Sequence, residues 1–362
     1  MEKTTKTRKI LLSGGGTGGS VSPLLAVAEA LKKKGDFEFL FVGTANGPEK
    51  DMVAKAGLPF AVISSGKLRR YFDWHNFIDL FKIKLAFWQS LFLLIKNRPD
   101  LVITAGSFVA VPLVWAAGLL NIPCLVHQMD IRPGLANILM APFAKFVTVT
   151  FEKSLMDYGA KAVWTGNPSQ LSIINYQLSI SDARKFFNLK DGLPTVFVVG
   201  GGTGAVAINK LVEDNLVELS SFCQIIHSTG KGKMTSIKNE NYHAFEFLNT
   251  EEMAKALLAC DLVITRAGIG TLTDLVVFKK PAIIIPMPKT HQEENAQYFA
   301  EKGAGVYLKQ LELDGPKFVA AFKDFLFDDE GMLKRASENI GKIMKEGAAQ
   351  NVADLALRII KK

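Results

Sequence analysis

A glycine-rich turn at residues 266–270, reading RAGIG, has residue types that bind a phosphate group. It follows an apolar, β-branched run at 262–265 that is typical of a buried strand, and a helix is expected from Thr271 to Lys279. Glycine lets backbone N–H groups approach an anion, and a helix N-terminus carries roughly half a positive charge. Asp274, one turn into the helix, can accept hydrogen bonds from a ribose diol. The pattern predicts a nucleotide-diphosphate site, with an ordinary strand–turn–helix connection as the alternative.

The segment after this helix adds amide side chains to the predicted site. Residues 282–285 are expected to form the next strand and residues 286–290 a loop. Gln292 and Asn295 then lie three residues apart, so they share one face if the segment is helical. Groups suited to phosphate, ribose and an amide together indicate a nucleotide diphosphate as the ligand.

A second glycine loop, GGGTGG at residues 14–19, follows a short apolar run near the N-terminus. Its glycines cost conformational entropy unless the backbone must approach something closely, and successive backbone N–H groups can form a concave anion site. The loop is therefore predicted to bind an anion, and a tight turn used only for packing is the alternative.

The two halves of the chain repeat one another. KILLSGGGTGGSVSPLLAVAEAL at 9–31 matches TVFVVGGGTGAVAINKLVEDNL at 195–216, and PDLVITAGS at 99–107 matches CDLVITRAG at 260–268. Each half therefore runs strand, glycine loop and helix, followed by a second strand that begins with Asp-Leu-Val-Ile-Thr. This repeat predicts two similar α/β domains with parallel sheets, in which the glycine loops leave the carboxyl ends of strands.

The composition is typical of a globular protein with an anionic partner. The chain has 362 residues, 48% of them hydrophobic and 22% charged, and a net charge of +8. This length fits two domains, and the charge indicates a phosphate or a membrane surface as partner. The three cysteines lie singly in apolar surroundings, so we expect no disulfide framework, no metal site and a reducing cytosol. The basic N-terminus lacks the apolar length of a signal peptide, and the apolar run at 85–95 is too short to span a bilayer.

Aromatic and basic residues alternate between positions 67 and 98. Such a segment suits a helix that inserts to headgroup depth and attracts anionic lipid. A core-facing helix with solvated lysines is the alternative, and nucleic-acid binding is not expected because no recognition motif accompanies the segment. The residues predicted to contact a membrane are Arg69, Arg70, Trp74, Lys82, Lys84 and Trp88.

Three motifs in the second half resemble the donor site of the MurG family of glycosyltransferases. They are Arg-Ala-Gly-x-x-Thr-Leu-x-Asp from Arg266, Pro-Ala-x-x-x-Pro-x-Pro from Pro281, and His-Gln-x-x-Asn-Ala from His291. The resemblance extends over essentially the whole chain. Members of this family are membrane-associated and transfer N-acetylglucosamine from UDP-GlcNAc to the lipid-linked muramyl pentapeptide of peptidoglycan.

The resemblance implies a GT-B fold, in which two doubly wound Rossmann-like domains face each other across a cleft. Residues 1–166 would form an acceptor- and membrane-facing domain, closed by a C-terminal helix at 346–362, and residues 167–345 a UDP-sugar-binding domain. The acceptor diphosphate would lie on Gly16, Thr17, Gly18 and Gly19. The donor would contact Gly202, Thr203, Gly204, Leu248, Gly268, Ile269, Gly270, Thr271, Leu272, Asp274 and Gln292. For Leu248 the alternative is a position in the core. For Arg266 the alternative is a structural cation at the end of the strand.

Several residues depart from the family pattern near the predicted reaction. Where the family commonly has a histidine after the first glycine loop, a glutamate in its His-Glu-Gln-Asn motif and an arginine after Gly-Asn-Pro-Val, this chain has Ser20, Gln128 and Gln170. Gly202 replaces a serine, and Asp274 a longer glutamate.

These replacements decide which residue can be the general base. A serine of ordinary pKa cannot take a proton near neutrality, Gln128 has no titratable group, and His127 is expected to be a structural core residue. Asp130 is therefore predicted to be the catalytic base, with Ser20 and the Gly18–Gly19 backbone orienting the acceptor. The alternative is that no base remains and the protein only binds.

The resemblance implies an inverting transfer of GlcNAc to the 4-hydroxyl of a lipid-diphosphate-linked N-acetylmuramyl peptide. No cofactor and no protein-bound metal are expected, because helix N-termini can stabilise the departing UDP and no Asp-x-Asp motif is present. The expected location is peripheral, on the cytoplasmic face of the plasma membrane. The alternatives are a related transferase with another nucleotide sugar or lipid acceptor, and a nucleotide-sugar-binding protein without turnover.

Overall fold

The computed structural model describes residues 7–64, 66, 75–172, 179–328 and 331–361. The chain divides into two compact units: unit 1 combines Met1–Ile173 with Met344–Lys362, and unit 2 is Ile174–Ile343. The sequence analysis expected the first domain to end at Gly166, whereas unit 1 continues for seven more residues, to Ile173. One reason is that Asn167 is buried in unit 1, where its side chain meets the ring of His127.

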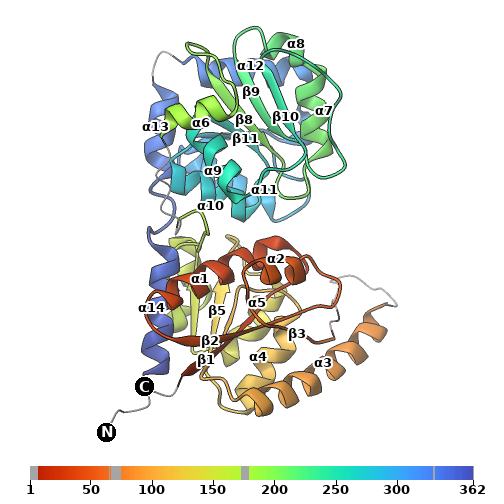
Figure 1. Ribbon diagram of the computed structural model, residues 1–362, viewed down its shortest axis with the longest axis vertical. Coiled ribbons are helices and arrows are strands. Elements are labelled where there is room, and N and C mark those ends of the chain that lie inside the picture. The colour runs from red at the N-terminus through yellow and green to blue at the C-terminus, as the bar shows by residue number, and fades with distance from the viewer. Residues whose placement is uncertain (1–6, 65, 67–74, 173–178, 329–330, 362) are drawn as a thin grey trace. The chain divides into compact units, whose positions relative to one another are not determined.

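Unit 1 is built on a parallel sheet (Figure 1). In the described part of the chain the sheet has seven strands in the order β3-β2-β1-β4-β5-β6-β7. Every pairing is parallel, and Leu11, for example, lies between Leu40 of β2 and Val102 of β4. The strands are β1 (Arg8–Ser13), β2 (Phe37–Gly43), β3 (Phe60–Val62), β4 (Leu101–Thr104), β5 (Cys124–Gln128), β6 (Phe146–Val149) and β7 (Ala162–Trp164).

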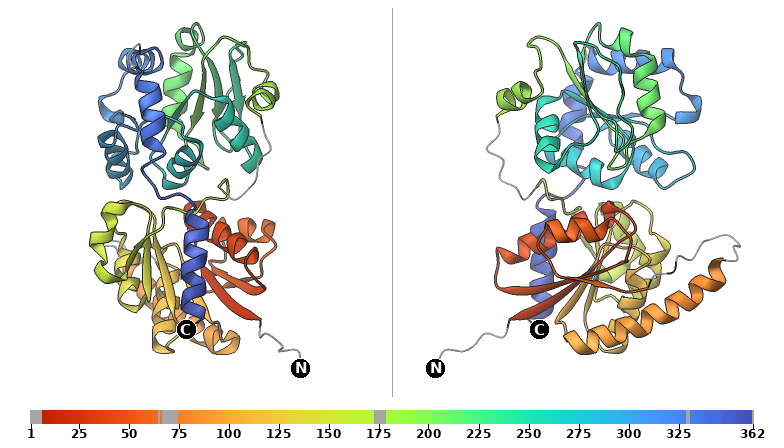
Figure 2. Two further views of the ribbon diagram at one scale, coloured as in Figure 1. Left: turned by 90° about the vertical axis from the view of Figure 1, so that its left-hand side faces the viewer. Right: turned by 45° about the vertical axis from the view of Figure 1, so that its right-hand side comes forward.

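Helices cover both faces of this sheet (Figure 2). Because successive strand residues point to opposite faces, Ile10 and Leu12 pack into one apolar cluster with helix α1, while Leu11 packs into a second cluster with α3 and α4. Both clusters are fully buried, as the strands of a doubly wound sheet require. The helices of unit 1 are α1 (Ser22–Lys32), α2 (Glu49–Lys55), α3 (His75–Asn97), α4 (Ala110–Leu119), α5 (Leu135–Met140) and α14 (Ala348–Ile360), with 3₁₀ turns η1 (Gly18–Ser20), η2 (Ala141–Phe143), η3 (Glu152–Asp157) and η4 (Gly159–Lys161).

The C-terminal helix α14 completes unit 1. It lies beside α1, as both views show (Figures 1 and 2), and contributes Ala349, Val352 and Ala353 to the core beneath α1. Two segments at opposite ends of the chain therefore share one core.

Unit 2 repeats the same architecture with a smaller sheet. Its described strands form a six-stranded parallel sheet in the order β10-β9-β8-β11-β12-β13. Val196 and Val198 face a cluster with α7 and α12, whereas Phe197 is buried on the opposite face. The strands are β8 (Thr195–Val199), β9 (Gln224–Ser228), β10 (Tyr242–Phe245), β11 (Leu262–Thr265), β12 (Ala282–Ile284) and β13 (Gly305–Tyr307).

The helices of unit 2 differ from the sequence predictions at their ends. Helix α10 begins at Ile269 rather than Thr271, so Gly268 is its N-cap. Helix α6 is capped by Ser179, whose Oγ accepts from the Asp182 N–H at 3.0 Å, and Ser181 lies within the helix. The helices are α6 (Ile180–Phe186), α7 (Val206–Asp214), α8 (Leu216–Leu219), α9 (Thr250–Ala259), α10 (Ile269–Phe278), α11 (Gln292–Glu301), α12 (Gly315–Leu326) and α13 (Met332–Ile340), with the 3₁₀ turn η5 (Gln310–Glu312).

Within the described residues, no helix has both the length and the apolar character needed to cross a membrane.

Candidate functional site

The duplicated motifs lie at the same place in each sheet. In unit 1 the chain order reverses between β1 and β4, and in unit 2 between β8 and β11. The two glycine loops follow β1 and β8. In each Asp-Leu-Val-Ile-Thr motif the last four residues form a strand, β4 or β11, and the aspartate immediately precedes it. Open parallel sheets bind ligands at the carboxyl ends of the strands at such a reversal. Each unit therefore has one candidate site, built by the residues that the sequence repeats.

The first glycine loop is held by its own serine. Ser20 is 4% exposed, and its Oγ accepts a hydrogen bond from the Gly15 N–H at 3.1 Å. The same hydroxyl lies 3.2 Å from the Gly15 oxygen and 3.3 Å from the Thr17 oxygen. The side chain of Ser20 is thus directed into the loop backbone, where it fixes the shape of the loop.

Glu49 braces the same loop from the start of α2. Its carboxylate is fully buried and accepts from the Gly16 N–H at 3.2 Å and from the Thr44 N–H at 2.9 Å, with a further hydrogen bond from the Thr44 hydroxyl. A Cβ on Gly15 would lie 2.5 Å from the Glu49 Oε1 atom, so glycine is needed for this approach. The sequence analysis gave Glu49 no role in a site.

Ser107, three residues after β4, is the third residue that holds the loop in place. Its φ of 88° is in a region that costs a non-glycine residue of order 1–3 kcal/mol. In this conformation its Oγ donates to the Gly15 oxygen at 2.9 Å. Strained backbone of this kind occurs mainly at functional sites. Here the Ser107 hydrogen bond connects the loop after β4 to the loop after β1, at the point where the chain order reverses.

His127 is a structural residue, as expected. Its Nδ1 lies 2.9 Å from the Thr148 hydroxyl and its Nε2 lies 2.9 Å from Asn167 Oδ1, so both ring nitrogens have partners. Burial lowers the pKa of His127 to about 4, although the hydrogen bonds to Asn167 and Thr148 act in the opposite direction. The imidazole is therefore neutral near pH 7.

Gln128 is the centre of a buried amide network at the end of β5. Its Oε1 accepts from Asn137 Nδ2 at 2.5 Å and from the Tyr158 hydroxyl at 3.0 Å, and its Nε2 donates to the backbone oxygen of Asp130 at 2.9 Å. Burial raises the pKa of Tyr158 above its ordinary value, so the phenol keeps its proton and remains a donor. The amide at position 128 thus holds the backbone that presents Asp130.

Asp130 itself is half-buried and follows β5 at the carboxyl edge of the sheet. β5 is two strands from β1, which corresponds to about 10 Å along the sheet edge. The carboxylate and the glycine loop therefore border the same stretch of edge, with the Ser107 turn between them.

In unit 2 the glycine loop after β8 packs backbone against backbone. A Cβ on Gly204, whose φ is 70°, would lie 2.0 Å from the Thr229 oxygen, so this position requires glycine. In contrast, a Cβ on Gly202 would meet no atom within 4 Å. Lys233 Nζ donates to the Thr203 oxygen at 2.6 Å, which places a cation on this loop. The sequence analysis did not single out Lys233.

Helix α10 presents an uncapped N-terminus to the second candidate site. Its N-cap Gly268 has no side chain to cap the first turn, and a Cβ on Gly268 or Gly270 would meet no atom within 4 Å. Such a turn offers backbone N–H groups to an anion. The Leu272 side chain is fully buried and its N–H is bonded to the Gly268 oxygen, so Leu272 supports the helix from within.

Polar side chains join the loops beside α10. Gln292 Oε1 accepts from the Met287 N–H at 3.0 Å, and Asn295 Nδ2 donates to the Ala267 oxygen at 3.3 Å. Arg266 Nη1 donates to the oxygens of Ile285 and Pro286 at 2.9 and 3.0 Å. Arg266 is thus a strand-end cation that connects β11 to the loop after β12, and burial lowers its pKa.

Two further predicted donor residues differ in exposure. Asp274 is half-buried on the second turn of α10, while the side chain of Leu248 is 4% exposed. The Leu248 side chain is therefore part of the interior, in line with the alternative raised from the sequence, and only its backbone remains for a ligand.

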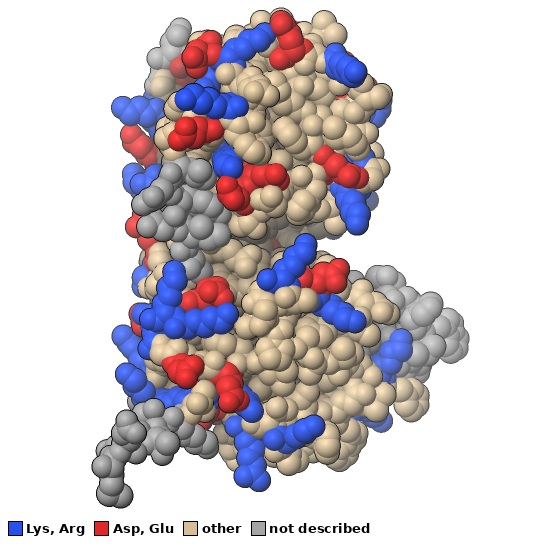
Figure 3. Space-filling model, viewed as in Figure 1, with Lys and Arg blue, Asp and Glu red and all other residues tan. Residues whose placement is uncertain are grey.

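Helix α3 has an exposed apolar stripe. Phe81, Leu85, Trp88, Phe92 and Ile95 recur every three or four residues, so they share one helix face, and each is more than half exposed. Lys82 and Lys84 on the same helix are exposed, whereas Arg69, Arg70 and Trp74 lie outside the described residues. Elsewhere on the face shown in Figure 3, Lys and Arg are interspersed with Asp and Glu.

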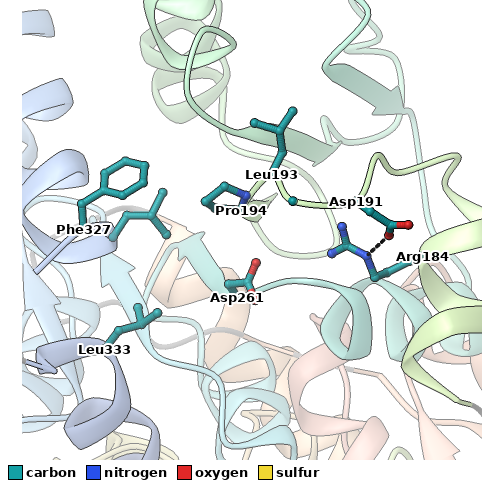
Figure 4. A pocket seen from close by; sticks show the side chains of 9 residues that line it. Arg184, Asp191, Leu193, Pro194, Asp261, Phe327 and Leu333 are labelled. Carbon is teal, nitrogen blue, oxygen red and sulfur yellow. Dashed lines mark ion pairs between the residues drawn. The ribbon is translucent and has the colours of Figure 1, made fainter. Parts of the chain in front are cut away.

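A cavity of about 510 Å³ in unit 2 lies away from the candidate site of that unit. Figure 4 shows Asp261, Pro194 and Arg184 in its lining, with Arg184 paired to Asp191 at 3.9 Å. Asp261 and Pro194 precede β11 and β8, so this cavity is at the amino edge of the sheet. Within the described residues, no group of three or more His, Cys, Asp or Glu side chains is placed to hold a metal ion.

Known proteins with similar sequences are glycosyltransferases. Residues 10–149 match the glycosyltransferase family 28 N-terminal domain, and residues 195–352 match the glycosyltransferase family 28 C-terminal domain. The chain is 36% identical over 361 residues to the UDP-N-acetylglucosamine–N-acetylmuramyl-(pentapeptide) pyrophosphoryl-undecaprenol N-acetylglucosamine transferase of Clostridium botulinum, covering 98% of this chain and 100% of that one. The enzyme of the same name from Clostridium kluyveri is 35% identical over 362 residues, covering 98% and 99%.

Solved structures agree on the fold. The crystal structure of Acinetobacter baumannii MurG superposes with a TM-score of 0.75 at 24% identity, covering 97% of this chain and 99% of that chain. The predicted GT-B class, with two Rossmann-like domains, is confirmed. From its full-length identity to the clostridial enzymes and its two family 28 domains, the chain belongs to the MurG family of glycosyltransferases.

Proposed function

We propose that this protein transfers N-acetylglucosamine from UDP-GlcNAc to the 4-hydroxyl of a lipid-diphosphate-linked N-acetylmuramyl peptide. The observation that carries the proposal is 36% identity over 98% of the chain to a transferase whose name states that donor and that acceptor. Each unit has a glycine turn at the reversal of its sheet, which agrees with the proposal because both substrates carry a diphosphate.

Unit 2 binds the donor in this proposal. The N-terminus of α10 receives the diphosphate of UDP through the backbone of Gly268, Ile269, Gly270 and Thr271, supported by the absence of a side-chain cap there. Asp274 accepts hydrogen bonds from the ribose, and Gln292 is next to the sugar. The 202–204 loop, with Lys233 bound to it, supplies further donors to the phosphates.

Unit 1 binds the diphosphate of the acceptor on the first glycine loop. The N–H groups of Gly15 and Gly16 are already bonded to Ser20 and Glu49. The anion therefore binds the N–H groups that follow, on Thr17, Gly18 and Gly19. Ser20 acts by shaping this loop, which modifies the sequence-based hypothesis that its hydroxyl orients the acceptor.

The chemical step is a displacement with inversion and without a protein-bound metal. The acceptor hydroxyl oxygen forms a bond to the anomeric carbon, the bond from that carbon to the UDP oxygen breaks, and UDP leaves with the electron pair. The helix dipole and N–H groups of α10 stabilise the charge that develops on UDP. Asp130 takes the proton of the attacking hydroxyl, a contribution of about 10²–10⁴-fold to the rate.

Membrane association is part of the proposal, as a peripheral contact with the cytoplasmic face. It is supported by the exposed stripe of α3, because five large apolar side chains on one helix face suit insertion at headgroup depth. The lysines beside the stripe attract anionic lipid at about 1 kcal/mol each.

One assay tests the function. The protein is incubated with radiolabelled UDP-GlcNAc and a lipid-linked muramyl-peptide analogue, and both the labelled product and released UDP are measured. Equal amounts of product and UDP are expected. UDP-GlcNAc binding without product would favour the binding protein, and faster transfer from UDP-GalNAc would favour a related transferase.

A further inference from the structure

Unit 1 has a recessed apolar pocket that the proposed chemistry does not use. Its volume is about 220 Å³, and its walls come from α3, α4 and α5 and the turn before α4. The principal lining side chains are Ile83, Phe108, Val111, Trp115, Ala136 and Leu139. Trp115 is held in place because its Nε1 donates to the Leu139 oxygen at 3.0 Å. The pocket is smaller than the ~300–1,000 Å³ of typical small-molecule sites, so it suits a short branched hydrocarbon.

One wall of the pocket also borders the first glycine loop. The Phe108 ring would lie 3.1 Å from a Cβ on Gly16, and the preceding residue, Ser107, donates to the Gly15 oxygen at 2.9 Å. A ligand anchored on the loop by a phosphate therefore has the pocket directly beside it. A ligand that fits both must carry a hydrocarbon attached to its phosphate.

We propose that this pocket binds the phosphate-proximal isoprene units of the polyprenyl carrier of the acceptor. The inference rests on the proposed function and extends it from the headgroup to the lipid. A polyprenyl diphosphate has its first branched five-carbon unit bonded to the phosphate oxygen, so a diphosphate on residues 17–19 directs that unit to the Phe108 wall. The small volume admits only the first units, and the remainder of the chain stays in the bilayer. The pocket thus differs from the exposed stripe on α3, which contacts lipid without selecting it.

A chain-length series tests the pocket in the transferase reaction. Acceptor analogues with one headgroup and chains of one, two and four isoprene units are compared with the wild-type protein, without vesicles. KM is expected to fall at least tenfold from one unit to two, because apolar carbons are buried, and then to level off. Ala136→Phe fills the pocket and should abolish this dependence while kcat stays within twofold. Ile138→Phe, on the same helix but exposed and outside the lining, should behave like wild type.

A binding experiment tests the pocket without turnover. Geranyl diphosphate should change the tryptophan emission of the wild-type protein, inorganic diphosphate should not, and Trp115→Phe should remove the change. Gly134→Leu narrows the pocket where a Cβ meets no atom within 4 Å, so it serves as a second blocking variant if Ala136→Phe does not fold. Equal responses to both diphosphates, or an undiminished response in a folded blocking variant, would overturn the proposal.

The two experiments separate this inference from the proposed function. Sugar transfer that is indifferent to chain length would overturn the pocket and leave the transferase in place. Geranyl diphosphate binding that is lost in the blocking variants, in a protein that transfers no sugar, would support the pocket and overturn the transferase.

Discussion

The carboxylate of Glu49 accepts a hydrogen bond from the Gly16 N–H at 3.2 Å. The side chain reaches the loop from the first turn of α2 and is fully buried there. Two further hydrogen bonds come from Thr44, which follows β2. One acidic residue therefore connects the loops after β1 and β2 and sets which N–H groups of the glycine loop remain for a ligand.

Replacing Glu49 by alanine should loosen the loop and destabilise unit 1. The variant leaves part-buried N–H and O–H donors without their acceptor, which costs up to about 1–3 kcal/mol of unfolding free energy. It should also raise KM for the acceptor more than it lowers kcat. Urea denaturation and steady-state kinetics measure the two effects. The matched control is Glu38→Ala, whose exposed pair with Lys9 contributes at most about 1 kcal/mol; equal effects of the two variants would show that Glu49 is not a brace.

Asp130→Asn tests the assignment of the base. The substitution keeps the size of the side chain and removes only its capacity to take a proton. We expect kcat to fall by about 10²–10⁴-fold with little change in KM for either substrate. Full kcat in a wild-type-like protein would exclude Asp130 as the base.

Asp274→Ala tests the donor site. Loss of a charge-assisted acceptor for the ribose should weaken UDP binding by about 1–3 kcal/mol, measured by calorimetry. Asp214→Ala on α7, which removes an exposed acid paired with Lys210, is the control and should bind UDP normally. Unchanged affinity in the folded Asp274 variant would remove this residue from the site.

The apolar stripe of α3 should control membrane binding. Replacing Phe81, Trp88 and Phe92 by serine removes three side chains that are 74%, 65% and 70% exposed, so stability should change little. Sedimentation with anionic vesicles should fall strongly. Val217→Ser, at an equally exposed apolar position in unit 2, is the control.

The basic residues of the same segment should act through charge. Replacing Arg69, Arg70, Lys82 and Lys84 by glutamine should reduce vesicle binding at low salt, and the loss should shrink as salt rises. Equal sedimentation of both forms at low salt would count against membrane attraction by these residues.

The two buried histidines should make both units sensitive to acid. Burial lowers the pKa of His127 and of His227 from 6.5 to about 4. As the pH falls, these rings are therefore protonated at a higher pH in the unfolded chain than in the folded protein. The stability contributed by each neutral ring is complete above pH 6.5 and is lost as the pH falls toward 4, on the order of 3 kcal/mol per histidine. NMR titration of the imidazole protons should give two midpoints near pH 4. Midpoints near 6.5 for these rings would contradict the burial argument.

Much of the fold could be predicted because the chain is duplicated. The 262–265 strand has the predicted bounds, since a buried β-branched run after an aspartate leaves little choice of register. The start of α6 is harder to predict, because Ser179 and Ser181 are both of a residue type that can cap a helix. Ser179 and Asp182 have the spacing of an N-cap and the third residue of a helix, and the Ser179 hydroxyl also donates to the Asp182 carboxylate at 2.6 Å. That spacing was a usable signal for the correct cap.

The positions of the candidate site loops could be predicted from the sequence, but the hydrogen bonds that hold these loops could not. The sequence locates the glycines and Asp130, yet the direction of the Ser20 hydroxyl depends on how the loop closes on itself. Lys233 and Thr203 are 30 residues apart and meet only because β8 and β9 are neighbours. Contacts of this kind need the strand order, which a residue pattern alone does not give.

The discontinuity of unit 1 has a consequence for the order of events during synthesis. Residues 348–360 cover core positions beside α1, but they leave the ribosome after the whole of unit 2. Unit 2 is continuous from 174 to 343, so all of its strands are available before α14 has been made. Nascent chains fold domain by domain as they emerge. The second unit can therefore reach its native structure first, while the first exposes an apolar surface until α14 has emerged, and a chaperone would be most useful during that interval.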